Sequence, residues 1–133
     1  MEIFQIIHGH WRWILALTAL LLMGKYTLAL VKHSPFTALD QNIGQAFAAA
    51  MTVQFVLGLI VLINKMVSGG FNSRFHLEHA FTGMMAVALA HSLPMFKRSS
   101  ATMKFLMGLI LAILSIAAAI YNVAFIRGNW FYN

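Results

Sequence analysis

The chain alternates between long apolar runs and short polar segments. Because a helix needs about 20 mostly apolar residues to cross a bilayer, these runs predict four membrane-spanning helices. The predicted helices run roughly over Phe4 to Leu30, Leu39 to Ile63, Phe75 to Met95 and Lys104 to Ile126. The connections between them are short, which favours consecutive helices as antiparallel neighbours. The expected fold class is therefore an all-α integral membrane protein, a four-helix transmembrane up-down-up-down bundle.

Composition agrees with this pattern and excludes some chemistry. Hydrophobic residues make up 61% of the chain and charged residues 9%, whereas roughly a quarter of the residues of a soluble domain are charged. We therefore expect residues 1–133 to form a single transmembrane domain in contact with membrane lipids. Cysteine is missing from the sequence, which excludes disulfides, thiolate metal ligands and a thiol nucleophile.

The net charge of +6 comes from basic residues near the ends of the apolar runs, and nothing in their arrangement supports nucleic-acid binding. One side of the predicted bundle holds Arg12, Lys65, Arg74 and Arg127, and the other holds Lys25, Lys32, Lys97, Arg98 and Lys104. By the positive-inside rule, this distribution favours both termini outside. A set of aromatic residues on the termini's side predicts an interfacial belt: Trp11, Trp13, Trp130, Phe131 and Tyr132.

Two histidines are expected at the same depth in the membrane. His8 lies about one turn into the first apolar run, and His79 lies about one turn into the third run. Alternate helices run parallel in such a bundle, so both enter from the same side. An ionisable side chain at membrane depth usually faces the bundle interior and marks a functional site. Imidazole is also the usual axial ligand of a membrane haem. The pair predicts a haem b between the first and third helices, with His8 and His79 as metal ligands.

Four further residues are candidates for the walls of that site. Gly83 lies one turn beyond the second histidine, where a missing side chain leaves room for a flat macrocycle. Arg12 and Arg74 are basic groups where haem propionates are expected to emerge. Gln54, near the middle of the second run, must find partners inside the bundle. It is expected either to line a haem or quinone pocket or to link helices.

The remaining histidines predict other roles. His10 lies on nearly the opposite face of its helix from the first histidine of the pair, so one cofactor cannot use both. We expect His10 and His76 to be interfacial and His33 to be a solvated loop residue. His91 lies about 18 Å further along its predicted helix than the paired histidine. We expect it to be hydrogen bonded, near Asp40 or Lys25, and therefore expect a single haem.

Several short motifs occur in a fixed order along the first three predicted helices. They are His8-x3-Arg12-Trp13, Pro35-Phe36-Thr37 with Asp40 and Gly44, Gln54-Phe55-x-Leu57-Gly58-Leu59, and Glu78-His79. This pattern resembles a family of small bacterial four-helix membrane proteins, commonly labelled cytochrome b or cytochrome-b-like and frequent in Bacteroidetes and related groups. The resemblance implies haem ligation at His8 and His79 and a multi-pass protein of the bacterial inner membrane.

The sequence thus predicts a haem-b-binding electron carrier or accessory subunit rather than a stand-alone enzyme. Its expected partners are membrane quinone or subunits of a larger respiratory or photosynthetic complex. The main alternative is a non-catalytic structural subunit, or one that binds pigment or lipid. A small transporter or metal-handling protein is disfavoured because no discontinuous helix or repeat symmetry is expected. Convergence of His8 and His79 across an interhelical gap favours the cofactor, whereas histidines pointing to lipid headgroups favour the structural role.

Overall fold

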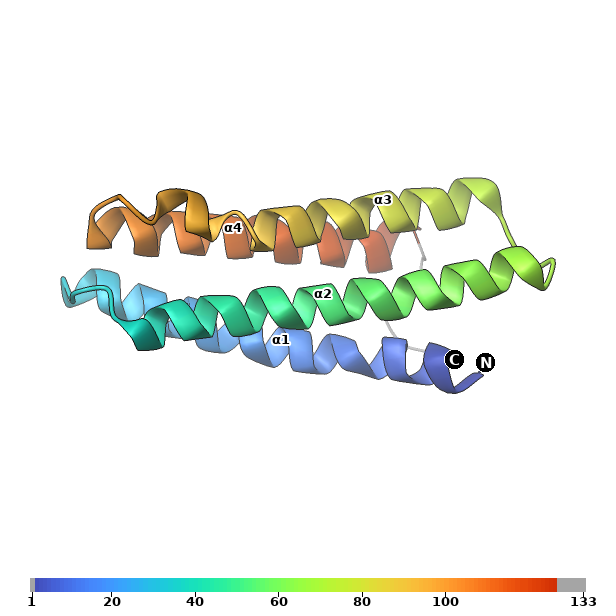
Figure 1. Cartoon of the computed structure of the whole chain (residues 1–133), viewed down its shortest axis with the longest axis horizontal. Coiled ribbons are helices and arrows are strands. Elements are labelled where there is room, and N and C mark those ends of the chain that lie inside the picture. The colour runs from blue at the N-terminus through green and yellow to red at the C-terminus, as the bar shows by residue number, and fades with distance from the viewer. Residues whose placement is uncertain (1, 127–133) are drawn as a thin grey trace.

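A computed structural model describes residues 2–126, in which all regular structure is helical (Figure 1). The long helices are α1 (Glu2–Val31), α2 (Ala38–Val67), α3 (Ser73–Ala90) and α4 (Ala101–Tyr121). A 3-10 helix, η1 (Leu93–Phe96), follows α3, and a π-helix, η2 (Asn122–Ile126), continues α4. Side-chain caps begin three of these helices: Thr37 for α2, Asn72 for α3 and Ser100 for α4. Each accepts a hydrogen bond from a main-chain N–H of the first turn, which would otherwise have no partner.

The third predicted helix differs most from the structure. It was expected to continue to Met95, but α3 ends at Ala90, and η1 begins at Leu93. Proline has no main-chain N–H, and its ring collides with the carbonyl four residues earlier. Pro94 therefore prevents α3 from continuing past Ala90. The expected end of the third helix at Met95 is therefore wrong.

Three helical stretches among the described residues are long and apolar enough to cross a membrane: Glu2–Val31, Ala38–Val67 and Ala101–Ala124. The third helix, α3, is not one of them. It is shorter and its first two turns contain Arg74 and Glu78.

The four long helices lie along a common direction and surround one interior (Figure 1). The first helix, α1, packs against α2 and α4, and α3 packs against the same two helices. Therefore α1 and α3 occupy opposite corners of the bundle. Side chains from these two helices meet only by reaching across its centre.

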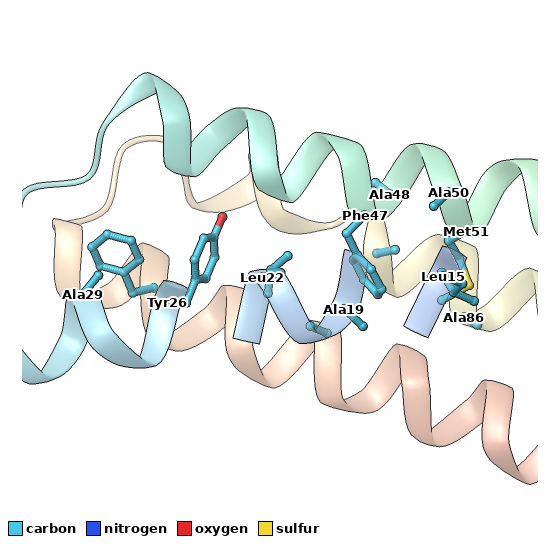
Figure 2. Packing of buried hydrophobic residues seen from close by; sticks show 13 residues of the cluster. Leu15, Ala19, Leu22, Tyr26, Ala29, Phe47, Ala48, Ala50, Met51 and Ala86 are labelled. Carbon is cyan, nitrogen blue, oxygen red and sulfur yellow. The ribbon is translucent and has the colours of Figure 1, made fainter. Parts of the chain in front are cut away.

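Near the connections that follow α1 and precede α4, the interior is filled by an aromatic cluster. The Tyr26 ring makes edge contacts with Phe36 and Phe105 at centroid distances of 6.1 and 5.2 Å. Gly108 of α4 lies directly against the Tyr26 ring, so a side chain there would overlap the ring. Figure 2 shows Tyr26 as one of a row of buried α1 side chains that continues toward Leu15. This end of the bundle is closely packed.

A buried carboxylate ties α1 to α2 at the same end. Asp40 is 1% exposed, and its Oδ1 lies 3.3 Å from Lys25 Nζ. Its Oδ2 accepts hydrogen bonds from the main chain and hydroxyl of Thr37, completing a capping box. The Tyr26 hydroxyl donates to the Asp40 main-chain oxygen at 2.9 Å. A buried carboxylate is stable only when it is paired and hydrogen bonded in this way.

Candidate cofactor site

His8 of α1 and His79 of α3 lie next to one another in the interior of the bundle. Their ring centroids are 6.2 Å apart, and the ring planes make an angle of 67°. Both side chains are half-buried. Two imidazoles that bind one metal ion from opposite sides have ring centroids about 6 Å apart, because each ligating nitrogen lies about 2 Å from the metal. The observed spacing therefore fits ligation of one metal ion by both rings.

Gln54 of α2 contacts His8 with its main chain and its side chain. His8 Nδ1 lies 3.1 Å from the Gln54 main-chain oxygen, which can only accept a hydrogen bond. In the tautomer with the ring proton on Nδ1, this contact is a hydrogen bond and Nε2 carries the lone pair that can bind a metal. The Gln54 amide nitrogen also lies 3.2 Å from Nδ1, a contact that suits the other tautomer. The Gln54 amide nitrogen donates to the His8 main-chain oxygen at 3.1 Å and lies 3.4 Å from His8 Nε2. Gln54 therefore both orients the ring and links α1 to α2.

Two glycines keep the walls beside these rings thin. A Cβ atom on Gly58 of α2 would lie 2.9 Å from His8 Cε1, closer than real side chains come. The imidazole therefore occupies the space that a side chain at Gly58 would fill. A Cβ on Gly83 of α3 would lie 3.3 Å from the Phe55 ring. Gly83 lines the cavity described below, and the Phe55 ring lies in the space beside it that was expected to admit a flat macrocycle.

His79 is positioned from both α3 and η2. The Asn122 side chain donates from Nδ2 to the His79 main-chain oxygen at 2.9 Å. On its own helix, Phe75 stacks on the His79 ring with a centroid distance of 6.1 Å and an interplanar angle of 21°. Asn122 is 6% exposed. Its bond replaces part of the hydration that a polar group loses on burial and joins the end of α4 to α3.

A cavity of about 600 Å³ runs through this half of the bundle, and His8, His79, Gln54 and Gly83 all line it. Protein interiors normally leave few voids larger than a water molecule, and small-molecule sites are commonly about 300–1,000 Å³. All four long helices contribute to the wall, which is mainly apolar. The bundle is thus closely packed at the Tyr26 end and hollow around the two histidines.

The basic residues at the cavity differ in part from those expected. Arg12 is half-buried and lines the cavity, with its guanidinium carbon 5.5 Å from the centroid of the Trp13 ring. Lys65, at the last turn of α2, also lines it. Arg74 does not: its side chain is 89% exposed and pairs with Glu78 at 3.1 Å. Arg74 is therefore placed at the surface, outside the cavity wall.

Of the other histidines, only His76 lines the cavity, and its Nδ1 lies 2.9 Å from the main-chain nitrogen of Asn72. His10 is exposed, and its Nδ1 lies 2.8 Å from the Ile6 main-chain oxygen. His33 is an exposed residue in the connection after α1, as expected.

His91, which caps the end of α3, contacts Thr52 of α2, with 2.8 Å between Nε2 and Oγ1. It was expected near Asp40 or Lys25. The structure instead gives it a hydroxyl partner on α2, so the expectation of a hydrogen bond holds and that of its partner is wrong.

The aromatic belt predicted on the termini's side is described only in part. Trp11 donates from Nε1 to the Ala50 main-chain oxygen at 3.0 Å, which directs its polar atom toward α2. Trp13 is 51% exposed. Trp130, Phe131 and Tyr132, as well as Arg127, lie outside the described residues.

Sequence reasoning missed Asn122 and Lys65 as parts of the site. Asn122 is a polar residue at the end of a long apolar run, which is the signal that pointed to Gln54 in the second run. Lys65 was counted only as a charge at a helix end. Its place on the cavity wall depends on the rotation of α2 about its own axis, which the sequence does not reveal.

The donor set decides which metal species the pair could hold. Within residues 2–126, no group of three or more His, Cys, Asp or Glu side chains is arranged to hold a metal ion. A bare zinc or iron ion generally needs at least three protein ligands. Two imidazoles suffice for an iron whose other four ligands come from a porphyrin. A macrocycle-bound metal is therefore the species for which two imidazole ligands are enough.

In comparisons with known proteins, no protein-family model, curated protein or solved structure matches the chain.

Proposed function

We propose that this protein is a membrane-embedded electron carrier that binds one haem b between His8 and His79. The observation that supports it most is the meeting of these two rings across the bundle at 6.2 Å, inside a cavity large enough for a ligand. The resemblance to small cytochrome-b-like membrane proteins leads to the same proposal. When bound, haem supplies a one-electron redox centre whose potential depends on its axial ligands and surroundings.

The proposal includes insertion in the bacterial inner membrane as an up-down-up-down bundle. Both termini are proposed to lie on the outer side of that membrane. The support for insertion is the outer surface of the described helices, where large apolar side chains such as Leu17, Leu20 and Leu28 are more than half exposed. Soluble monomers rarely expose apolar patches of this extent, whereas lipid covers them without cost. The distribution of basic residues favours the stated orientation.

Each residue of the site has a defined part in holding the cofactor. The main-chain oxygen of Gln54 would accept a hydrogen bond from His8 Nδ1 when Nε2 serves as the ligand. Gly58 makes room for the ring, and Gly83 thins the opposite wall. Arg12 is the basic group best placed for a haem propionate, because an arginine can bind a carboxylate with two hydrogen bonds. Arg74 is not assigned this role.

The molecule that exchanges electrons with the protein is proposed to lie in the membrane. The connections between the described helices are short, so they offer little surface to a soluble donor. A membrane quinone or a subunit of a larger respiratory or photosynthetic complex can approach the cavity from the side. We therefore expect electrons to enter and leave through one of these partners.

A second candidate function is a structural subunit, or one that binds pigment or lipid. The observation that favours it is the set of hydrogen bonds between His8 and Gln54, which joins α1 and α2 without a cofactor. A histidine can also ligate the magnesium of a chlorophyll. The two functions differ in which pigment the purified protein holds and in whether that pigment changes oxidation state.

Reconstitution tests the proposal directly. Protein purified in detergent is titrated with haemin, and the complex is quantified by its absorption and by pyridine haemochrome analysis. We expect saturation at one haem per chain. His8→Ala and His79→Ala should each abolish stable binding, and His10→Ala is the matched control. Saturable binding of chlorophyll instead of haem, or no binding by folded protein, would contradict the proposal.

A further inference from the structure

The fully charged side chains on the cavity wall are basic. Among residues 2–126, the wall includes Arg12 of α1 and Lys65 of α2, and no aspartate or glutamate lines it. Both basic side chains are half-buried. A cation beside a mainly apolar cavity loses part of its hydration, and pairing with an anion offsets that loss. The wall therefore favours a ligand that brings negative charge.

Lys65 has no acidic partner within the part of the chain that the structure describes. The ion pairs there join Lys25 to Asp40 and Arg74 to Glu78. Arg74 is already paired at the surface, whereas the stem of Lys65 packs against the connection between α2 and α3. A Cβ atom on Gly70 of this connection would lie 3.3 Å from Lys65 Cδ. The connection therefore holds the lysine side chain at the rim of the cavity.

Lys65 marks the mouth of the cavity at the end of the bundle where α1 begins. It follows Gly58, the residue beside the His8 ring, by two helical turns, or about 10 Å along α2. The helix then ends at Val67, and Figure 1 shows the α2–α3 connection at the same end as the start of α1. Arg12 lies one turn beyond His8 in the other direction. Because helical side chains lean toward the N-terminus of their helix, Arg12 leans back toward this mouth.

The inner end of the cavity has the opposite character. Its wall consists of closely packed apolar side chains that are 1–4% exposed: Leu15, Ala19, Met51 and Ala86. Figure 2 shows these residues together in the interior. A carboxylate placed among them would lose its hydration and gain no partner. A flat ligand with one apolar edge and one anionic edge is therefore oriented by the wall, with its anionic edge toward the mouth.

We propose that Lys65 binds one propionate of the haem while Arg12 binds the other, so that the propionate edge faces the mouth. The inference rests on the proposed function, because the ligand whose carboxylates are assigned is haem b. Haem b carries two propionates on one edge and apolar substituents on the opposite edge, and this pattern matches the wall. The lysine ammonium group donates a charge-assisted hydrogen bond to the carboxylate. Lys65 thereby determines which way round the haem is bound.

Esterified haem isolates this contact, because haemin dimethyl ester lacks the carboxylate charges but keeps the macrocycle and the iron. Native protein in detergent, Lys65→Met, Lys65→Arg and Arg74→Met are each titrated with haemin and with the ester. Arg74→Met is the matched control, since it removes a basic residue near the same end that does not line the cavity. We expect Lys65→Met to bind haemin about tenfold more weakly, a change of about 1.4 kcal/mol, and to bind the ester as the native protein does. The other two variants should bind both compounds like the native protein.

The outcomes separate this inference from the proposed function. Haemin affinity that is unchanged in Lys65→Met would overturn the inference and leave the proposed function intact. Equal losses of haemin and ester in that variant would also overturn it, because the lysine would then not act through the carboxylates. An equal loss of haemin in Arg74→Met would reduce the effect to overall charge and overturn it as well. If the folded native protein binds neither compound, the proposed function fails and the inference fails with it.

Discussion

His8 Nδ1 and the main-chain oxygen of Gln54 lie 3.1 Å apart, across the interface between α1 and α2. A main-chain acceptor does not depend on the side chain at position 54. It therefore remains available to a protonated Nδ1 when that side chain is changed. The Gln54 side chain makes a separate contact, donating to the His8 main-chain oxygen.

Gln54→Leu should consequently show which part of Gln54 orients the His8 ring and which part stabilises the fold. It removes the amide contacts between α1 and α2 but keeps the main-chain acceptor. We expect the free energy of unfolding to fall by about 1 kcal/mol, the typical net worth of a hydrogen bond, with haem still bound at one per chain. Thermal unfolding in detergent and haemin titration check the two parts. Complete loss of haem in a folded variant would assign the ligand-orienting role to the side chain instead.

Gly58→Ala is expected to displace the His8 ring. The added Cβ would lie 2.9 Å from Cε1, so the ring or α2 must move. We expect haemin affinity to fall about tenfold, which corresponds to about 1.4 kcal/mol. Gly24→Ala is the matched control, because nothing lies within 4 Å of a Cβ there. In an exposed helical position that change should stabilise the protein by about 0.5–1 kcal/mol. Equal haemin affinities in the two variants would contradict the close approach of His8 to Gly58.

Gly108→Ala should weaken folding without touching the cofactor site. Its Cβ would overlap the Tyr26 ring at the packed end of the bundle. Overpacking of a well-filled interior typically costs about 1–3 kcal/mol. We expect a lower thermal unfolding midpoint and an unchanged haem content. Loss of haem at full stability would show that the two ends of the bundle are coupled.

Asp40→Ala removes the partner of Lys25 and the reciprocal half of the α2 capping box, in which Thr37 donates to the carboxylate, but it leaves Thr37 as the N-cap. Loss of the hydrogen bonds to the carboxylate should cost about 1 kcal/mol. The ion pair adds about 1 kcal/mol or less, because Lys25 is 39% exposed. Unfolding measurements should therefore show destabilisation of about 2 kcal/mol. Lys32→Ala, at an exposed position, serves as the control and should change little. If both variants unfold alike, the buried carboxylate contributes no net stability.

Much of the fold can be predicted from the sequence, because long apolar runs have few alternatives to helices. The helices α1, α2 and α4 lie where the runs predict them. The end of the third helix was predicted wrongly because hydropathy does not register the backbone effect of Pro94. Packing contacts such as Tyr26 against Gly108 also could not be predicted. They depend on the rotation of each helix about its axis.

The candidate site could also be predicted only in part: the depth of its residues could be predicted, but the direction of their side chains could not. The meeting of His8 and His79 follows from their distances to helix ends, which depth arguments capture. Arg74 was expected beside the cofactor but points outward to Glu78, because depth alone does not determine which way a side chain faces. Asn122, which is bonded to His79, was missed although a polar residue in an apolar run is the signal that pointed to Gln54.

The central claim is one haem held by His8 and His79, and a dithionite-reduced minus oxidised absorption spectrum tests it most directly. The spectrum is recorded on protein purified in detergent and on His8→Ala, His79→Ala, His10→Ala and His91→Ala. The account predicts a b-type α band in the native protein that is lost in the first two variants and kept in the last two. A folded protein without this band, or a band that survives both His8→Ala and His79→Ala, would contradict it.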